Sequence, residues 1–155
     1  MKRFLAIDQG TTSSRAIVFN SDLNSIVDSQ KDYELEYPKD GWVEADALQI
    51  LKTVSETVEA VICDDNLDIE SCGITNQRET TIVWSKKTGE PIYPAIIWQD
   101  RRTSAYCLKL KAEGYEDMVI KKTGLLLDPY FSASKICWIL ENIPNARSEA
   151  ELGNL

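Results

Sequence analysis

The first residues that could do chemistry lie in the stretch AIDQGTTSSRAIVF, residues 6–19, where two apolar runs flank a polar turn. A glycine in such a turn lets the backbone approach a ligand without a Cβ in the way. Backbone N–H groups and nearby hydroxyls can then surround phosphate oxygens. The hydroxyls that could do so are those of Thr11, Thr12 and Ser13. Asp8 could hold Mg²⁺, directly or through water, and Arg15 could neutralise charge.

A plain polar hairpin with an Asx turn explains the same stretch equally well. The spacing is not that of a Walker A motif, because no G-x-x-x-x-G-K-[ST] occurs in the sequence. These residues alone therefore leave a phosphate site and an ordinary hairpin as equal alternatives.

A second candidate group is the pair Arg78 and Glu79, in GITNQRETTIVW. The pair follows an apolar run that we expect to be a strand, and active sites of α/β sheets gather beyond the carboxyl ends of strands. A guanidinium beside a carboxylate offers donors and acceptors suited to vicinal hydroxyls. An exposed ion pair on the surface is the simpler alternative.

Two aromatic residues could complete a site for a small polyol. Trp98, in AIIWQDRRT, could form a wall against the carbon side of such a ligand. The alternative is a buried core tryptophan before a helix that is capped by Asp100 or Thr103. Tyr130, in LLLDPYFSASK, could donate its hydroxyl, although half-buried packing is the commoner role of such a tyrosine.

Composition excludes several classes of protein. The chain has no histidine, which removes Ser-His-Asp and Cys-His catalysis and any His-ligated zinc site. Its formal net charge of -8 argues against binding to nucleic acid or to anionic membranes. No window reaches the roughly 18 apolar residues of a spanning helix. The four cysteines show no C-x-x-C spacing, so we expect small, buried, reduced thiols in a cytoplasmic protein.

The elements that must position these residues follow from apolar patterning. Residues 2–7, 15–19 and 25–37 are predicted strands joined by tight turns, which makes an antiparallel meander. Asp46 is a good N-cap for a helix whose apolar positions recur up to residue 62. Residues 69–74 form a predicted fourth strand, parallel to the first because a helix precedes it. This order predicts one α/β domain.

The second half of the chain is predicted to be mainly helical. Short strands are expected at residues 80–84 and 95–98, around a turn at residues 86–89. Helical patterns follow from residue 101 to 112, over 134–140 and over 146–152.

Five stretches taken in order carry a family resemblance: AIDQGTTSSRAIVF, YPKDGWVEAD, GITNQRETTIVW, PAIIWQDRRT and TGLLLDPYFSASKICWIL. They resemble the N-terminal domain of the FGGY family of carbohydrate kinases, and within it the members that phosphorylate glycerol. The resemblance covers essentially the whole chain. It implies a ribonuclease-H-like (actin-like ATPase) α/β domain, with a mixed sheet of an antiparallel meander and then a parallel strand, and with flanking helices. It also implies phosphorylation of glycerol to sn-glycerol 3-phosphate with ATP and Mg²⁺.

The resemblance also implies roles for the candidate residues. Thr11, Thr12, Ser13 and Arg15 fall on the nucleotide-phosphate loop of the family, and Asp8 on its metal-associated carboxylate. Arg78, Glu79 and Tyr130 fall on positions that bind the glycerol hydroxyls, and Trp98 on the apolar wall. A cytoplasmic homo-oligomer is implied for the full-length enzyme.

The chain departs from the family in length. Family members are several times longer, with a second actin-like domain, and their catalytic base is an aspartate beyond the position of Leu155. We therefore interpret residues 1–155 as a partial N-terminal domain, incomplete at its C-terminal end, that holds no catalytic base and is inactive alone. The alternatives are a non-catalytic module that binds a nucleotide or polyol, and a kinase of another small polyol or sugar.

Overall fold

The computed structural model describes residues 2–63 and 68–155. These residues fall into two compact units. The sheet unit comprises Met1–Leu35 and Asp46–Arg78, and the helical unit comprises Glu36–Ala45 and Glu79–Leu155. The chain thus passes between the units three times, at points where the sequence shows no linker composition.

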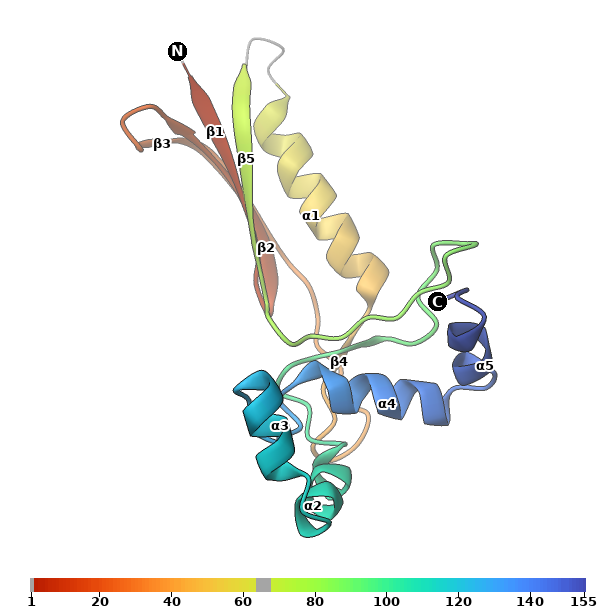
Figure 1. Cartoon of the computed structure of the whole chain (residues 1–155). Helices are drawn as coiled ribbons and strands as arrows, with labels where there is room; N and C mark the ends of the chain where they lie inside the picture. Colours follow the sequence, from red (N-terminus) through yellow and green to blue (C-terminus); the bar gives the residue numbers. More distant parts are fainter. Residues whose placement is uncertain (1, 64–67) are drawn as a thin grey trace. The chain divides into compact units, whose positions relative to one another are not determined.

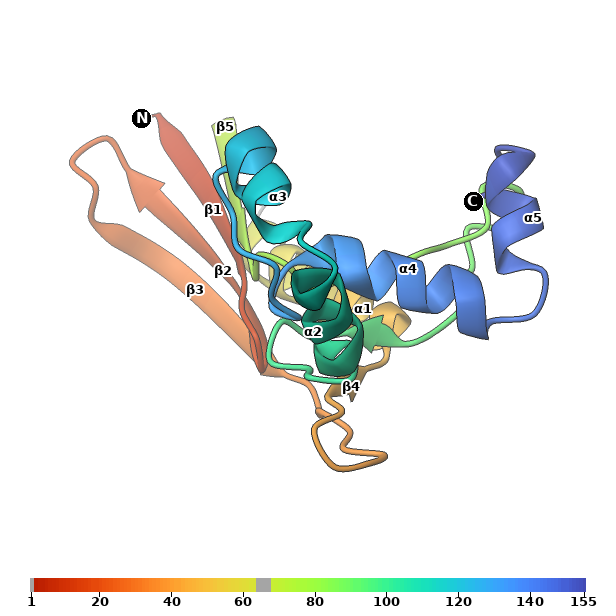
Figure 2. The ribbon, with the colours of Figure 1, turned by 60° about the horizontal axis from the view of Figure 1, so that its bottom comes forward.

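The sheet unit is built on four strands in the order β3-β2-β1-β5 (Figure 1). Strands β1 (Arg3–Gln9), β2 (Ser13–Asn20) and β3 (Ser25–Asp32) are antiparallel neighbours. Strand β5 (Ile69–Asn76) pairs with β1 in parallel. The predicted meander followed by a parallel strand is confirmed. Figure 2 shows β3 and β5 at the two edges of this sheet.

One face of the sheet is covered by α1 (Ala47–Ile62), which begins at the predicted cap. The carboxylate of Asp46 accepts hydrogen bonds from the N–H groups of Leu48 and Gln49, at 2.8 and 3.3 Å. The core between sheet and helix contains Leu5, Ala16, Val18 and Val61. In the register of β1 and β2, Asp8 lies opposite Arg15. Because strand side chains alternate between the two faces, both of these residues lie on the face away from α1.

Strand β3 is shorter than predicted. It ends at Asp32 instead of residue 37. At the next position the chain turns to the β1–β2 hairpin, where the N–H of Tyr33 donates to the carbonyl of Thr12 at 3.0 Å. Tyr33 is buried there, so its bulk serves the hairpin and not a longer strand.

The helical unit has little sheet. Strands β4 (Glu44–Ala45) and β6 (Ala95–Ile96) form one short antiparallel pair. The predicted strand at residues 80–84 is wrong, since only isolated bridges at Thr81 and Trp84 occur there. The predicted strand at 95–98 is reduced to two residues.

Four helices make up the rest of this unit: α2 (Ser104–Ala112), α3 (Glu116–Thr123), α4 (Ser132–Asn142) and α5 (Ala146–Glu151). Three of them were predicted within a few residues. Helix α3 was not, because none of its residues is buried and it has no apolar row to reveal it. Within the described part of the chain, no helix is long and apolar enough to cross a membrane.

The four cysteines are free thiols, as expected. The expectation that all of them are buried is wrong: Cys107 is buried, but Cys63 and Cys72 are exposed.

Candidate functional site

The β1–β2 hairpin closes tightly over Gly10. Its N–H donates to the carbonyl of Ser13 at 2.8 Å. A Cβ added at position 10 would stand 3.1 Å from that same oxygen, closer than most real Cβ contacts. A larger residue would therefore have to displace the Ser13 carbonyl by a few tenths of an ångström, so glycine suits the close approach of the two strand ends.

A neutral hydrogen-bond network stabilises the turn of this hairpin. The Tyr33 hydroxyl donates to the carbonyl of Gly10 at 2.5 Å. It accepts from the side-chain amides of Gln9 and Gln77 at 3.1 and 2.9 Å. Burial raises the pKa of Tyr33, so the phenol stays protonated. The sequence analysis did not predict this hydrogen-bond network. Its one signal in the sequence was the bulky Tyr33 after a run of polar residues.

The hydroxyl cluster of the hairpin is divided between two roles. Ser14 is fully buried, and its hydroxyl lies 2.9 Å from that of Thr53 on α1. Thr12 is exposed, and Thr11 and Ser13 are half-buried. Ser14 therefore attaches the hairpin to the helix, whereas the three residues assigned to phosphate binding remain nearer the surface.

Asp8 and Arg15 differ in their partners. Asp8 is exposed, closes no Asx turn, and accepts no hydrogen bond from another described residue. Arg15 forms an ion pair with Asp28 of β3 at 2.8 Å, with both side chains nearly half exposed. No cluster of three or more His, Cys, Asp or Glu side chains suited to a metal exists among the described residues. A lone, accessible carboxylate does fit Mg²⁺, which binds to one or two carboxylates plus phosphates and water.

Glu79 is the best anchored of the candidate residues. One oxygen of its carboxylate, Oε2, accepts hydrogen bonds from both the N–H and the hydroxyl of Ser132, each at 2.9 Å. The alternative of an exposed ion pair is therefore wrong for Glu79. Its neighbour Arg78 is exposed and ends the sheet unit, so the chain divides this candidate pair between the two units.

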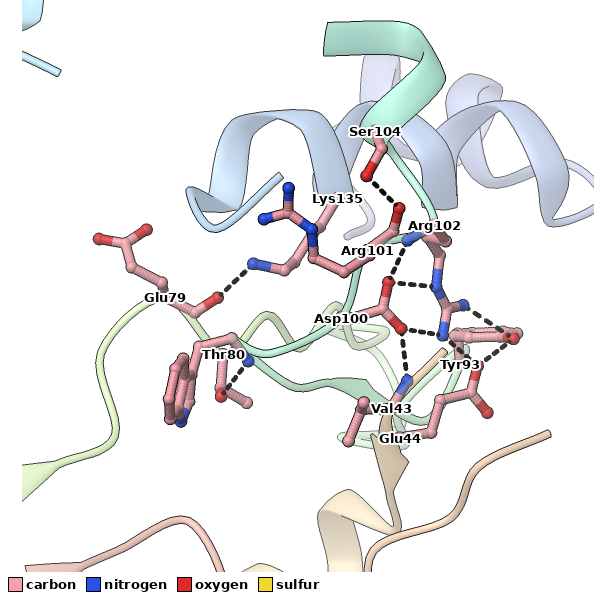
Figure 3. Close-up of polar contacts among 11 residues, drawn as sticks. Val43, Glu44, Glu79, Thr80, Tyr93, Asp100, Arg101, Arg102, Ser104 and Lys135 are labelled. Carbon is pink, nitrogen blue, oxygen red and sulfur yellow. Dashed lines mark hydrogen bonds and ion pairs between the residues drawn. The ribbon is translucent and has the colours of Figure 1, made fainter. Parts of the chain in front are cut away.

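A buried lysine, Lys135, contacts the main chain of Glu79 (Figure 3). The ammonium of Lys135 donates to the carbonyl of Glu79 at 3.1 Å and to that of Tyr130 at 2.5 Å. Burial lowers the pKa of Lys135 to about 8, against the opposing effect of the Asp100, Glu79 and Asp128 carboxylates. Sequence reasoning missed Lys135, although a lone lysine near the start of the apolar α4 stretch was the available signal.

Trp98 and Tyr130 are brought together. Their rings meet edge to face, with centroids 5.9 Å apart and planes at 68°. The backbone N–H of Trp98 donates to the Thr80 hydroxyl at 3.2 Å, next to Glu79 in the chain. Trp98 is only half-buried, so the alternative of a buried core tryptophan is wrong. Tyr130 is half-buried as well, which agrees with either a binding or a packing role.

Asp100 does not cap helix α2. It is fully buried, accepts from the N–H of Val43 at 2.7 Å, and pairs with Arg102 at 2.8 Å. Thr103 occupies the cap position but makes no side-chain capping bond, since its hydroxyl contacts Ser134.

The Arg102 guanidinium is the centre of a second buried polar cluster. It pairs with Glu44 at 2.7 Å and with Asp100 at 2.8 Å (Figure 3). It also lies over the rings of Trp42 and Trp138, at 3.8 and 4.6 Å from their centroids. Burial acts to lower the pKa of Arg102, but hydrogen bonds to the two carboxylates outweigh it and the pKa is raised. One buried cation is thus shared by two buried carboxylates, one of which, Asp100, lies two residues after Trp98 in the chain.

Comparison with known proteins assigns the chain. A sequence profile of the FGGY family of carbohydrate kinases, N-terminal domain, matches residues 3–154. The chain belongs to the FGGY family. Its fold is the ribonuclease-H-like, actin-like fold that the resemblance predicted. A xylulose kinase of the same fold from Lactobacillus acidophilus superposes with a TM-score of 0.87 at 21% identity.

More similar FGGY relatives are glycerol kinases. That of Shewanella frigidimarina is 53% identical over 99% of this chain, and that of Nitrosomonas eutropha 54% identical over 97%. The crystal structure of Plasmodium falciparum glycerol kinase with ADP matches 99% of the chain, with a TM-score of 0.95 and 33% identity. The chain spans about a third of these proteins: 32% of the Shewanella enzyme and 31% of each of the other two.

Proposed function

We propose that this chain is the N-terminal part of a glycerol kinase, which transfers the γ-phosphoryl group of ATP to glycerol and yields sn-glycerol 3-phosphate. The 53% identity to a Shewanella glycerol kinase over nearly the whole chain supports this substrate. Homo-oligomeric assembly and a cytoplasmic location are parts of the same proposal. Four free thiols agree with a reducing compartment.

The observation that carries the proposal is the anchored Glu79 carboxylate in the same unit as the Trp98–Tyr130 ring pair. Ser132 occupies one carboxylate oxygen and leaves Oε1 available to accept from a glycerol hydroxyl. Aromatic rings suit the carbon side of glycerol, which has no polar atoms to satisfy. In this proposal Tyr130 donates to another glycerol oxygen, and the exposed Arg78 of the sheet unit keeps the glycerol-binding role that the family resemblance implies for it.

The nucleotide phosphates are assigned to the β1–β2 hairpin. Thr11, Thr12 and Ser13 donate there to phosphate oxygens, and Arg15 supplies positive charge. Asp8 holds Mg²⁺, which neutralises phosphate charge when bound. Since the overall charge of the chain is -8, these local donors have to attract the anion.

In the proposed reaction a glycerol oxygen forms a bond to the γ-phosphorus while the bond from that phosphorus to ADP breaks. The glycerol proton passes to a base, which we assign to an aspartate in a C-terminal actin-like domain beyond Leu155. The residues of this chain contribute positioning and charge neutralisation. Residues 1–155 alone are accordingly expected to show no useful turnover.

The test uses the full-length protein in an assay of glycerol-dependent ADP release. Glu79→Gln is expected to raise the KM for glycerol at least tenfold, because an amide replaces the acceptor that Ser132 orients. Glu90→Gln, at an exposed turn, is the matched control and should leave the KM unchanged.

Wild-type protein that releases no ADP with glycerol would contradict the proposal. Turnover with another polyol or a sugar in a substrate panel would then identify a kinase of different specificity. Ligand binding without turnover on any substrate would identify a non-catalytic module.

A further inference from the structure

Glu79 has a backbone conformation that must be held in place. Its φ is 65°, in the left-handed region, although the residue is not glycine. This conformation costs about 1–2 kcal/mol for an L-residue. Such residues persist where surrounding contacts determine them, and they cluster at functional sites.

The first turn of α4 binds both the side chain and the main chain of Glu79. Ser132 donates twice to the carboxylate, and Lys135 donates to the main-chain carbonyl of the same residue. Residues three apart on a helix lie on one side of it, so both contacts come from a single rigid surface. The side chain and the peptide of Glu79 are thereby oriented together.

Lys135 also connects Glu79 to Tyr130. Its ammonium bridges the two carbonyls, although Lys135 and Glu79 are 56 residues apart in sequence. We propose that Ser132 and Lys135 are positioning residues, which set the Glu79 carboxylate and the Tyr130 main chain in the geometry that a polyol requires. This inference rests on the proposed function, and it assigns to these two residues no contact with substrate.

A purely structural role explains Lys135 less well. Its side chain is fully buried, and in the described part of the chain its ammonium forms no direct ion pair; the carboxylates of Asp100, Glu79 and Asp128 act on it only from a greater distance. Burying a cation without a paired anion is unfavourable, and an apolar side chain would fill the same space more cheaply. What Lys135 adds is the pair of directed hydrogen bonds to two candidate substrate-binding residues.

The experiment measures glycerol and ATP kinetics separately in the full-length protein. Lys135→Met keeps an unbranched apolar stem similar to that of lysine and removes the ammonium, and we expect it to raise the KM for glycerol tenfold or more. The KM for ATP should stay within about twofold. Ser132→Ala should raise the KM for glycerol only about threefold, because the backbone N–H of residue 132 still donates to Glu79. Ser132→Thr, which keeps a hydroxyl, should restore the wild-type KM.

Two matched variants control for nonspecific effects. Lys109→Met and Ser148→Ala alter an exposed lysine on α2 and an exposed serine on α5, and neither should change the kinetics. Near-ultraviolet circular dichroism of each variant reports whether the aromatic environment is retained. If Lys135→Met does not fold, the Ser132→Ala and Ser132→Thr pair decides the matter.

An unchanged KM for glycerol in folded Lys135→Met, or in Ser132→Ala where Lys135→Met does not fold, would overturn the inference while leaving the proposed function intact. Equal increases in the KM for glycerol and for ATP would also overturn it, since they indicate general loosening. Failure of the wild-type protein to use glycerol would instead overturn the proposed function, and the two failures are therefore distinguishable.

Discussion

The two candidate binding regions are supported in different ways. The β1–β2 hairpin rests on a neutral network of one phenol and two amides around Tyr33. The helical unit, which holds Glu79 and Trp98, contains two buried cations: Lys135 donates to the Glu79 carbonyl, and Arg102 pairs with Glu44 and Asp100. Its candidate groups are half-buried, whereas Asp8 and Arg15 of the hairpin are exposed.

The difference matches what each proposed ligand demands. A phosphate group with its metal brings several equivalent oxygens and strong charge, so accessible donors on a tight turn suffice. A small neutral polyol offers only directional hydrogen bonds, and these lose strength when the partner is misplaced. A site for the polyol therefore needs a rigid carboxylate, and buried charges provide that rigidity. Perturbing the cations should consequently have larger effects than perturbing the hairpin.

The largest effect is expected from Arg102→Met. This change leaves the buried carboxylates of Asp100 and Glu44 without their cation. Removing one partner of a buried ion pair typically costs about 3–5 kcal/mol. Urea unfolding, followed by the fluorescence of Trp42 and Trp138 that stack on the guanidinium, measures the loss.

Arg101→Met is the matched control for this prediction. The Arg101 side chain is 55% exposed and pairs with Asp128 at the surface, so its loss should cost less than about 1 kcal/mol. Similar losses for the two arginines would show that the buried cluster contributes no more than a surface pair does.

The next effect concerns pH and Lys135. Its pKa is about 8 in the folded protein and 10.5 in the unfolded chain. Between these values the unfolded chain binds a proton that the folded protein does not, so the free energy of unfolding rises with pH through this window. The contribution is up to about 1.4 kcal/mol per pH unit.

The measurement compares urea unfolding of wild type and Lys135→Met from pH 7 to 10.5. Subtracting the variant removes the contributions of Tyr33 and Tyr93, whose raised pKa values act with the opposite sign. Parallel pH profiles for the two proteins would mean that the lysine is solvated in solution and does not form the buried bridge.

A smaller effect is expected from Tyr33→Phe in the hairpin. The Gly10 carbonyl then loses its donor and the amides of Gln9 and Gln77 lose their shared acceptor, at a cost of about 1–3 kcal/mol. Because the network is neutral, the loss should not vary between pH 6 and 8. A loss larger than that of Arg102→Met would reverse the ranking of the two regions.

The sequence predicted the sheet unit far better than the helical unit, for a physical reason. The order of β1, β2, β3, α1 and β5 follows from local apolar patterning, and Asp46 is a recognisable cap. The predicted strand at residues 80–84 failed because an apolar run there forms only isolated bridges. Helix α3 has no buried face and hence no pattern to detect.

The candidate site shows the same limit. Residue types and family resemblance identified Glu79, Trp98 and Tyr130 as candidates, but not what holds them. The ammonium of Lys135 donates to two backbone carbonyls. Every residue type has a backbone carbonyl, so the identity of the residues that accept from Lys135 cannot be predicted from their side chains. Arg102 was likewise hidden, since Glu44 lies 58 residues away in the sequence and only the fold brings it to the guanidinium.

The smallest effect on stability is expected from Arg15→Met. The ion pair with Asp28 is nearly half exposed on both sides, so its loss should change the free energy of unfolding by about 0.2–1 kcal/mol and less at high salt. Asp28→Asn should have a similarly small effect. The two variants should differ in their KM for ATP, measured in the full-length protein. Arg15→Met should raise this KM. Asp28→Asn should not, because it removes the ion-pair partner and leaves the Arg15 guanidinium available to phosphate. If both variants raised the KM for ATP equally, the ion pair itself would be required, and the hairpin would depend on fixed charge as the Glu79 region does.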